Sequence, residues 1–139
     1  MTDEDAVREA NERFYRAFES LNLEAMEAVW AHEDDVECVH PGWDLLVGWD
    51  AVRASWEIIF KNTEEIRFTL GDVRIRILGP IARVTCTENI LSQSRGKVSV
   101  TSVLATNLFE RTSGEWQMIH HHASHVFSEP LSPEPETFH

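Results

Sequence analysis

The segment WQMIHHHASHVF, residues 116–127, closes a run of strand-like sequence that begins near residue 64 and decides the fold class. Polar and apolar residues alternate in EIRFTL and VRIRIL. The later stretches ARVTCTENIL and VSVTSVLATNLFE and the closing segment are also typical of strands. Turn-forming sequences separate the later stretches: Gly79-Pro80, SRGK and RTSGE. The alternation changes phase after EIRFTL, which predicts a bulge or a sharp bend at Gly71-Asp72.

The residues before this run predict three helices. Segments 5–21 and 48–62 repeat apolar residues at steps of three and four, and Asn22 can cap a short helix between them. DDVECVHPGW, residues 34–43, predicts a short strand that ends at Pro41-Gly42. Three helices followed by antiparallel strands indicate one α+β domain, with the helices packed on one face of a curved sheet. Residues 128–139 hold three prolines and three glutamates, so we expect a mobile tail after a domain of residues 1–127.

Composition excludes several classes of partner. The chain has 24 acidic and 12 basic side chains, a net charge of −12, and such a surface repels nucleic acid and anionic lipid. Cys38 and Cys86 form no metal-binding or disulfide pattern, which favours a reducing compartment. No targeting leader and no apolar run of about 20 residues is present, so the sequence predicts a cytoplasmic protein.

The stretch VSVTSVLATNLFE carries apolar residues at both parities. Val98, Val100, Leu104 and Leu108 fall on one face of a strand, and Val103, Ala105 and Phe109 fall on the other. A sheet with one solvated face should alternate cleanly. Because helices can cover only one face, we expect the other to meet a second subunit in a homodimer.

Polar residues that interrupt apolar faces mark a candidate site, because a hollow with a few polar groups is the usual place for a ligand. Glu88, Asn107 and His121 each share strand parity with apolar neighbours, and His40 ends the short strand. Glu88 with His40 or His121 would make an acid/base pair. The alternative is a Glu88 in a salt bridge at a strand edge, with histidines that are satisfied core groups.

Tryptophan is frequent in the first half of the chain. Trp30, Trp43 and Trp56 could line a pocket for a flat or apolar ligand, and the alternative is that they pack in the core. In the closing segment, His120 and His122 have the spacing of two metal ligands on a strand. A catalytic metal needs a third ligand, and none is evident, so the sequence predicts neither a metal nor another cofactor.

The chain resembles the SnoaL-like family of the nuclear transport factor 2-like superfamily over about residues 5–127. The segments that carry the resemblance are ANERFYRAFESLNLEAMEAVW, VHPGW, VGWDAVRASWEIIF and, most specifically, GEWQMIHHHAS. It implies a cystatin-like α+β roll with a conical cavity between helices and sheet. The HHHAS ending is also similar to the association domain of calcium/calmodulin-dependent protein kinase, whose pocket would correspond here to Met26, Glu88, Asn107 and Ala123. The basic groups of that pocket are absent, so its anionic ligands are not implied.

The superfamily includes ketosteroid isomerase, but its catalytic tyrosine and aspartate correspond here to Phe14 and His40, with Tyr15 next to the first. We therefore expect a homodimer whose cavity binds a small apolar or aromatic molecule. If it is an enzyme, the reaction is a cofactor-free isomerisation, cyclisation or hydrolysis. His40 would be the base and Glu88 the acid or an orienting group, with Tyr15, Asn107 and His121 as hydrogen-bond partners. The alternative is a non-catalytic ligand-binding or oligomerisation module.

Overall fold

The computed structural model describes residues 1–127, so the predicted tail 128–139 lies outside the described residues. Three helices, α1 (Asp3–Ser20), α2 (Leu23–Val29) and α3 (Trp49–Lys61), accompany six strands. The strands are β1 (Glu37–Val39), β2 (Leu46–Val47), β3 (Glu65–Leu78), β4 (Ile81–Ser94), β5 (Lys97–Thr112) and β6 (Glu115–His125). The predicted α+β class is confirmed, and the two-residue strand β2 is the one element that the sequence did not indicate.

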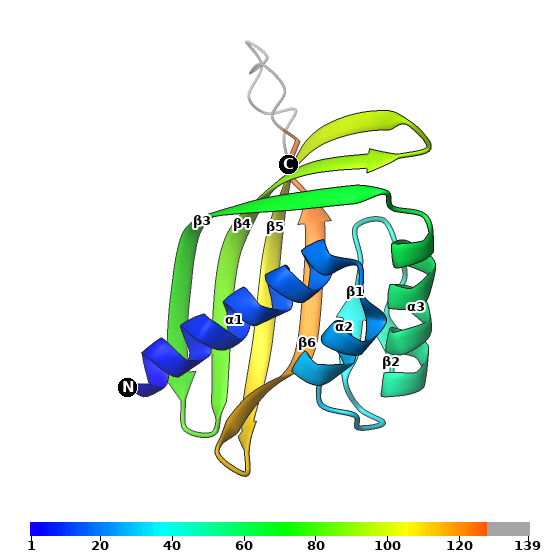
Figure 1. Ribbon diagram of the computed structural model, residues 1–139. Helices are drawn as coiled ribbons and strands as arrows, with labels where there is room; N and C mark the ends of the chain where they lie inside the picture. Colours follow the sequence, from blue (N-terminus) through cyan, green and yellow to red (C-terminus); the bar gives the residue numbers. More distant parts are fainter. Residues whose placement is uncertain (128–139) are drawn as a thin grey trace, which may run out of the picture.

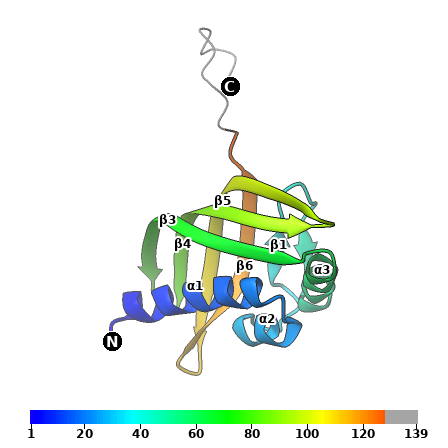
Figure 2. The ribbon, with the colours of Figure 1, turned by 45° about the horizontal axis from the view of Figure 1, so that its top comes forward.

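The six strands form one sheet in the order β2-β1-β6-β5-β4-β3. All neighbours are antiparallel except β1 and β6, which run parallel. The helices lie on one face of the sheet (Figure 1), and the sheet curves around them (Figure 2). The core therefore sits between the helices and the concave face, where cavities with polar groups are common.

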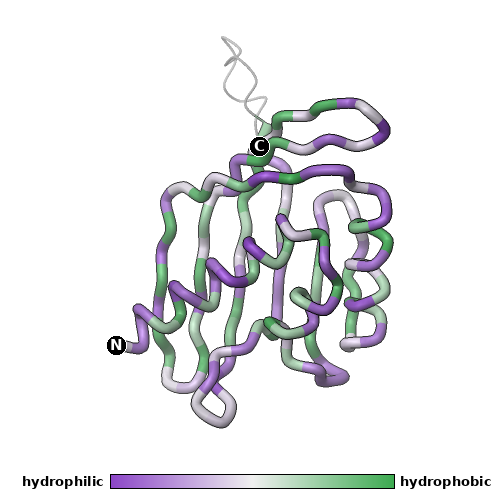
Figure 3. Tube along the Cα trace, in the orientation of Figure 1, coloured by the Kyte–Doolittle hydropathy of each residue, from purple (hydrophilic) through white to green (hydrophobic). Residues whose placement is uncertain are grey.

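Helix α1 begins where local chemistry favours a helix start. Thr2 and Asp5 form a reciprocal capping box, and acidic side chains fill the first turn beside the positive end of the helix dipole. The helix alternates between hydrophilic and hydrophobic residues along its length (Figure 3), as expected for one buried face. That buried face includes Asn11 and Tyr15, so α1 points two polar groups at the sheet.

Two register shifts shape the sheet. In β3 the pairing with β4 shifts between Gly71 and Arg74, and Asp72 has a left-handed backbone with a φ of 51°. This confirms the bulge predicted at Gly71-Asp72, and β3 turns sharply partway along its length (Figure 1). In β6 the pairing with β5 shifts next to Ile119, between the partners of His120 and Met118. Buried positions consequently change from even to odd numbers along β6.

Strand β5 has one buried face and one open face. Its residues at odd positions from 103 to 109 are buried under the helices. On the opposite face, the exposed fractions are 65% for Val98, 79% for Val100 and 51% for Leu104.

Within residues 1–127, no helix combines the length and apolar character that a membrane crossing requires.

Candidate functional site

Six polar side chains are buried within the described part of the chain, and they come from five different elements and one strand end. They are Asn11 on α1, His40 directly after β1, Ser55 on α3, Glu88 on β4, Asn107 on β5 and His121 on β6. Buried polar groups are costly unless they are hydrogen-bonded, so their partners define what this cluster can do.

Glu88 is 2% exposed and bonds to the helix that covers it. The Tyr15 hydroxyl donates to Oε2 of Glu88, and the same hydroxyl lies 3.5 Å from Sγ of Cys86. Oε1 of Glu88 has no hydrogen-bond partner among residues 1–127. Burial raises the pKa of Glu88 to about 7, because a charged carboxylate is poorly solvated there, although the bond from Tyr15 acts in the opposite direction. Glu88 therefore exchanges a proton near neutral pH.

Asn107 is the centre of the network. Its Nδ2 donates to Oδ1 of Asn11 at 2.9 Å and to the hydroxyl of Tyr15 at 3.1 Å, which uses both amide hydrogens. Its Oδ1 lies 2.6 Å from Nδ1 of His121. Burial is the main cause that holds the pKa of His121 well below its ordinary value, and the nearby His40 adds to it. His121 is therefore neutral at physiological pH.

His40 has a separate set of contacts. Its Nε2 lies 2.8 Å from Oγ of Ser55, and that hydroxyl donates to the carbonyl oxygen of Val52 at 2.6 Å. Because the single hydroxyl hydrogen is used on Val52, Nε2 of His40 must donate to Ser55. Burial lowers the pKa of His40 to about 4, so this imidazole is also neutral near pH 7. Its ring centre lies 6.3 Å from that of His121.

A cavity of about 330 Å³ opens onto this cluster. Its polar lining comprises His40, Glu88, Ser92, Ser99, Thr101, His121 and His125, and its apolar lining includes Phe18, Pro41, Trp43, Ile59, Ile66, Ile90, Val103 and Ala123. None of the described residues that line it is a lysine or an arginine. The volume is at the small end of the range for ligand sites.

The predicted site residues divide into three groups. His40, Trp43, Glu88 and His121 line the cavity, and Trp43 is 37% exposed at its wall. Tyr15 and Asn107 lie behind that wall, bonded to Glu88 and His121. Met26, Trp30 and Trp56 are almost completely buried and do not belong to the lining. Trp56 still touches the site, because its ring centre lies 4.7 Å from that of His40.

Sequence reasoning overlooked Asn11 and Ser55. Both lie on the buried stripe of a helix, Asn11 four residues after Val7 and Ser55 three residues after Val52. The signal was therefore present: a polar residue on an apolar face, which is the same signal that selected Glu88.

The histidine run is divided between the two faces of the sheet, as its alternation predicts. His121 lines the cavity, whereas the side chain of His120 lies beside Glu37, with Nδ1 3.2 Å from Oε1. His122 is exposed. Across residues 1–127, no group of three or more histidine, cysteine, aspartate or glutamate side chains is arranged to hold a metal ion.

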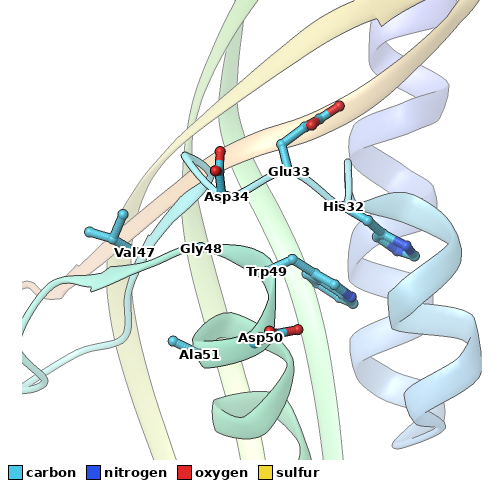
Figure 4. Close-up of a pocket in the computed structure, with 8 residues that line it drawn as sticks. All are labelled: His32, Glu33, Asp34, Val47, Gly48, Trp49, Asp50 and Ala51. Atoms are coloured by element: carbon cyan, nitrogen blue, oxygen red, sulfur yellow. The ribbon is translucent and has the colours of Figure 1, made fainter.

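A second pocket, of about 380 Å³, lies at the start of α3 (Figure 4). His32 stacks on Trp49 with ring centres 4.4 Å apart, and Glu33, Asp34 and Asp50 stand around them. The lining side chains are exposed or half-buried. This pocket contains no buried polar group, so its chemistry is that of an ordinary acidic surface.

Comparisons with known proteins agree with this architecture. A family model described as a SnoaL-like domain matches residues 7–128. The F-box protein SKIP8 of Arabidopsis thaliana is 33% identical over 119 residues, which are 86% of this chain and 49% of SKIP8. The chain thus spans about half the length of that curated relative.

Two solved structures resemble the chain in both fold and sequence. A proposed dehydratase of the nuclear transport factor 2-like family from Streptomyces avermitilis is 41% identical, with a TM-score of 0.84 over 89% of this chain and 96% of that one. A proposed calcium/calmodulin-dependent protein kinase type II association domain from Thiobacillus denitrificans is 32% identical, with a TM-score of 0.76 over 85% and 93% of the two chains.

Proposed function

We propose a function for this chain, which belongs to the SnoaL-like family of the nuclear transport factor 2-like superfamily. Its cavity binds a small neutral molecule, and Glu88 transfers protons to and from that molecule without a cofactor. One observation carries the proposal: Oε1 of Glu88 has no partner among the described residues, and Glu88 lines a largely apolar cavity. A carboxyl group with a pKa of about 7 is well matched to acid/base work at neutral pH.

The substrate is expected to be uncharged. The cavity lining contains a carboxyl group but no lysine or arginine that could neutralise a carboxylate or a phosphate. The net charge of −12 also disfavours the approach of an anion. The apolar walls, which include Phe18, Ile90 and Val103, suit a hydrocarbon or aromatic body.

The reaction that fits one exchangeable carboxyl group is a proton removed and then returned by the same residue. Glu88 as carboxylate takes a proton from a carbon next to a carbonyl group, and the C–H electron pair moves into the substrate. Returning the proton to another carbon gives an isomer. Returning it to a β-hydroxyl group breaks the C–O bond and releases water. The second course is dehydration, the activity proposed for the Streptomyces avermitilis protein.

The histidines would orient the substrate and would not carry the main proton. Both are neutral near pH 7, and the pKa of each is lowered by burial, which makes an imidazole a weaker base. In this assignment Tyr15 holds Oε2 of Glu88, so that Oε1 faces the ligand. His40 and His121 bond to polar groups of the substrate.

Proton abstraction can be tested before the natural substrate is known. Cyclic ketones are incubated with the protein in D₂O, and NMR follows deuterium entering the carbon next to the carbonyl. The wild-type protein should accelerate exchange, and Glu88→Gln should reduce the acceleration by about 10²- to 10⁴-fold. Exchange at an equal rate in Glu88→Gln would remove Glu88 from the proposal.

A second candidate is a non-catalytic ligand-binding or oligomerisation module. The observation that favours it is the 32% identity to the proposed kinase association domain from Thiobacillus denitrificans. It predicts that neutral ligands bind, or that the protein only assembles, with no exchange by the wild-type protein. The same experiment, combined with a binding measurement, therefore separates the two functions.

We also propose a homodimer that forms through the open face of the sheet. Val98, Val100 and Leu104 are exposed, and they have the strand parity opposite to that of Ser99, Thr101 and Val103, which line the cavity. Leu104→Glu should convert a dimer into a monomer in sedimentation experiments, because a buried charge without a partner opposes association. Leu45→Glu, on a loop residue that is 53% exposed, is the matched control and should leave the mass unchanged. A monomeric wild-type protein would refute this arrangement.

The proposed location is the cytoplasm. Cys38 and Cys86 are both free and buried, which suits a reducing compartment where disulfides are rare.

A further inference from the structure

The position of the hydrogen between Asn107 and His121 follows from counting the hydrogens that Asn107 donates. The amide nitrogen of Asn107 spends its two hydrogens on Asn11 and on the Tyr15 hydroxyl. Its oxygen, which can only accept, is the atom that lies 2.6 Å from Nδ1 of His121. The hydrogen in that contact must therefore belong to His121.

The orientation of this amide is held from outside the cavity. If the Asn107 amide turned over, its nitrogen would face His121 and its oxygen would face Asn11 and Tyr15. The Tyr15 hydroxyl would then have to give its hydrogen to Asn107, and it could no longer donate to Glu88. Asn11 would have to present its own nitrogen in place of its oxygen. Reversal thus requires three side chains to change together.

We infer that Asn11 and Asn107 are positioning residues that fix His121 as the tautomer with hydrogen on Nδ1 and none on Nε2. The unprotonated Nε2 can then accept a hydrogen bond in the cavity, so the site selects ligands that donate one. This inference rests on the proposed function only for its ligand. The substrate class is narrowed to neutral molecules that carry a hydroxyl or an N–H group. A ketone or an ether of the same shape has no hydrogen to donate to the unprotonated Nε2.

Asn11 acts in this scheme without touching the ligand. It lies on α1, is 1% exposed and does not belong to the cavity lining. Its influence passes through Asn107 to the ring of His121. A merely structural Asn11 would affect stability but would leave the tautomer of His121 unchanged, which makes the two roles distinguishable.

The first test reads the tautomer directly. Protein labelled with ¹⁵N in histidine is examined by long-range ¹H–¹⁵N correlation at pH 7, and the signals of His121 are identified by their loss in His121→Gln. The wild-type protein should show a protonated Nδ1 and an unprotonated Nε2. A His121 population with half or more of its hydrogen on Nε2 would overturn the inference, and this measurement needs no destabilised variant.

Variants at Asn11 test its positioning role. Asn11→Leu removes the acceptor and should increase the population of His121 with hydrogen on Nε2. Asn11→Asp keeps an acceptor and should retain the wild-type tautomer, and it serves if Asn11→Leu does not fold. The matched control is Asn62→Leu, at the exposed cap that follows α3, which should leave the tautomer of His121 unchanged. A wild-type tautomer in folded Asn11→Leu would contradict the role assigned to Asn11.

The ligand class is tested with cyclohexanol and cyclohexanone, which have rings of the same size and of which only the alcohol can donate a hydrogen bond. At pH 5.5 the carboxyl group of Glu88 is mostly protonated and can bond to either molecule, and burial holds the pKa of His121 well below its ordinary value. The wild-type protein should bind the alcohol about three- to tenfold more tightly, and His121→Phe should lose this preference. Equal binding of both molecules by the wild-type protein would refute the selection of donors. Binding of neither would refute the proposed ligand cavity, and the tautomer result would stand apart from it.

Discussion

Replacing Glu88 by glutamine should make the protein more stable at alkaline pH. The physical reason is the buried carboxyl group, which the folded protein holds at a pKa of about 7 in place of its ordinary value of 4.5. The folded state therefore binds this proton more tightly than the unfolded chain does. The resulting stabilisation is complete below about pH 4.5 and is lost as the pH rises through about 7. Glutamine has the same shape and no charge to bury.

The size of the effect follows from the pKa. At about 1.4 kcal/mol per pH unit, a rise from 4.5 to about 7 corresponds to about 3 kcal/mol of unfolding free energy. The difference in stability, Glu88→Gln minus wild type, should therefore grow by up to about 3 kcal/mol between pH 4.5 and pH 8. His40 and His121 act in the opposite sense, because burial lowers the pKa of each and stability falls when the pH drops below their ordinary value of 6.5. Both histidines remain in the variant, so their effect cancels in the difference.

The assay is urea unfolding followed by tryptophan fluorescence, at equal protein concentration, at four pH values from 5 to 8. The groups that face Glu88 are Tyr15 from α1 and Cys86 from its own strand, and burial raises the pKa of both, so neither titrates in this range. A difference in unfolding free energy that does not change with pH would refute the reasoning. So would a Glu88→Gln variant that is less stable than wild type at pH 8.

Three further predictions concern single side chains. Tyr15→Phe removes the hydrogen bond that lowers the pKa of Glu88, so the midpoint of the pH–rate profile for ketone exchange should move upward; an unchanged midpoint would contradict the assigned bond. His40→Ala removes a group that orients the substrate, so it should slow turnover and preserve the fold, as measured by exchange rate and circular dichroism, and full activity would exclude His40 from the site. Thr2→Ala removes the cap of α1 and should cost about 1 kcal/mol in urea unfolding, whereas a loss near zero would show that the cap is not formed in solution.

Much of the site could be predicted because strands expose their faces by simple alternation. Glu88, Asn107 and His121 were each identified as a polar residue among buried neighbours. In the structure Tyr15 bridges Glu88 and Asn107, and Asn107 bonds directly to His121. The bulge at Gly71-Asp72 was predictable for the same reason, since it appears in the sequence as a change of phase.

Other features depend on distances that no sequence pattern contains. Asn11 was missed because a helical stripe is wide and tolerates one polar member, and only its contact with Asn107 gives it a role. Strand β2 has two residues and therefore no periodicity to detect. Trp30 and Trp56 could be assigned to pocket or core only once their burial was known, and burial depends on how the helices pack.

The triple histidine has a consequence for the tolerance of this site to shifts in strand register. His121 pairs with Asn107 across the β5–β6 ladder, directly beyond the slip at Ile119, and it has a histidine on each side. If one residue were inserted or deleted at that slip, the strand beyond it would move by one position. His120 or His122 would then stand opposite Asn107. An imidazole would still face Asn107. The repeated histidine therefore allows the hydrogen bond to Asn107 to form after a register shift of one residue in either direction.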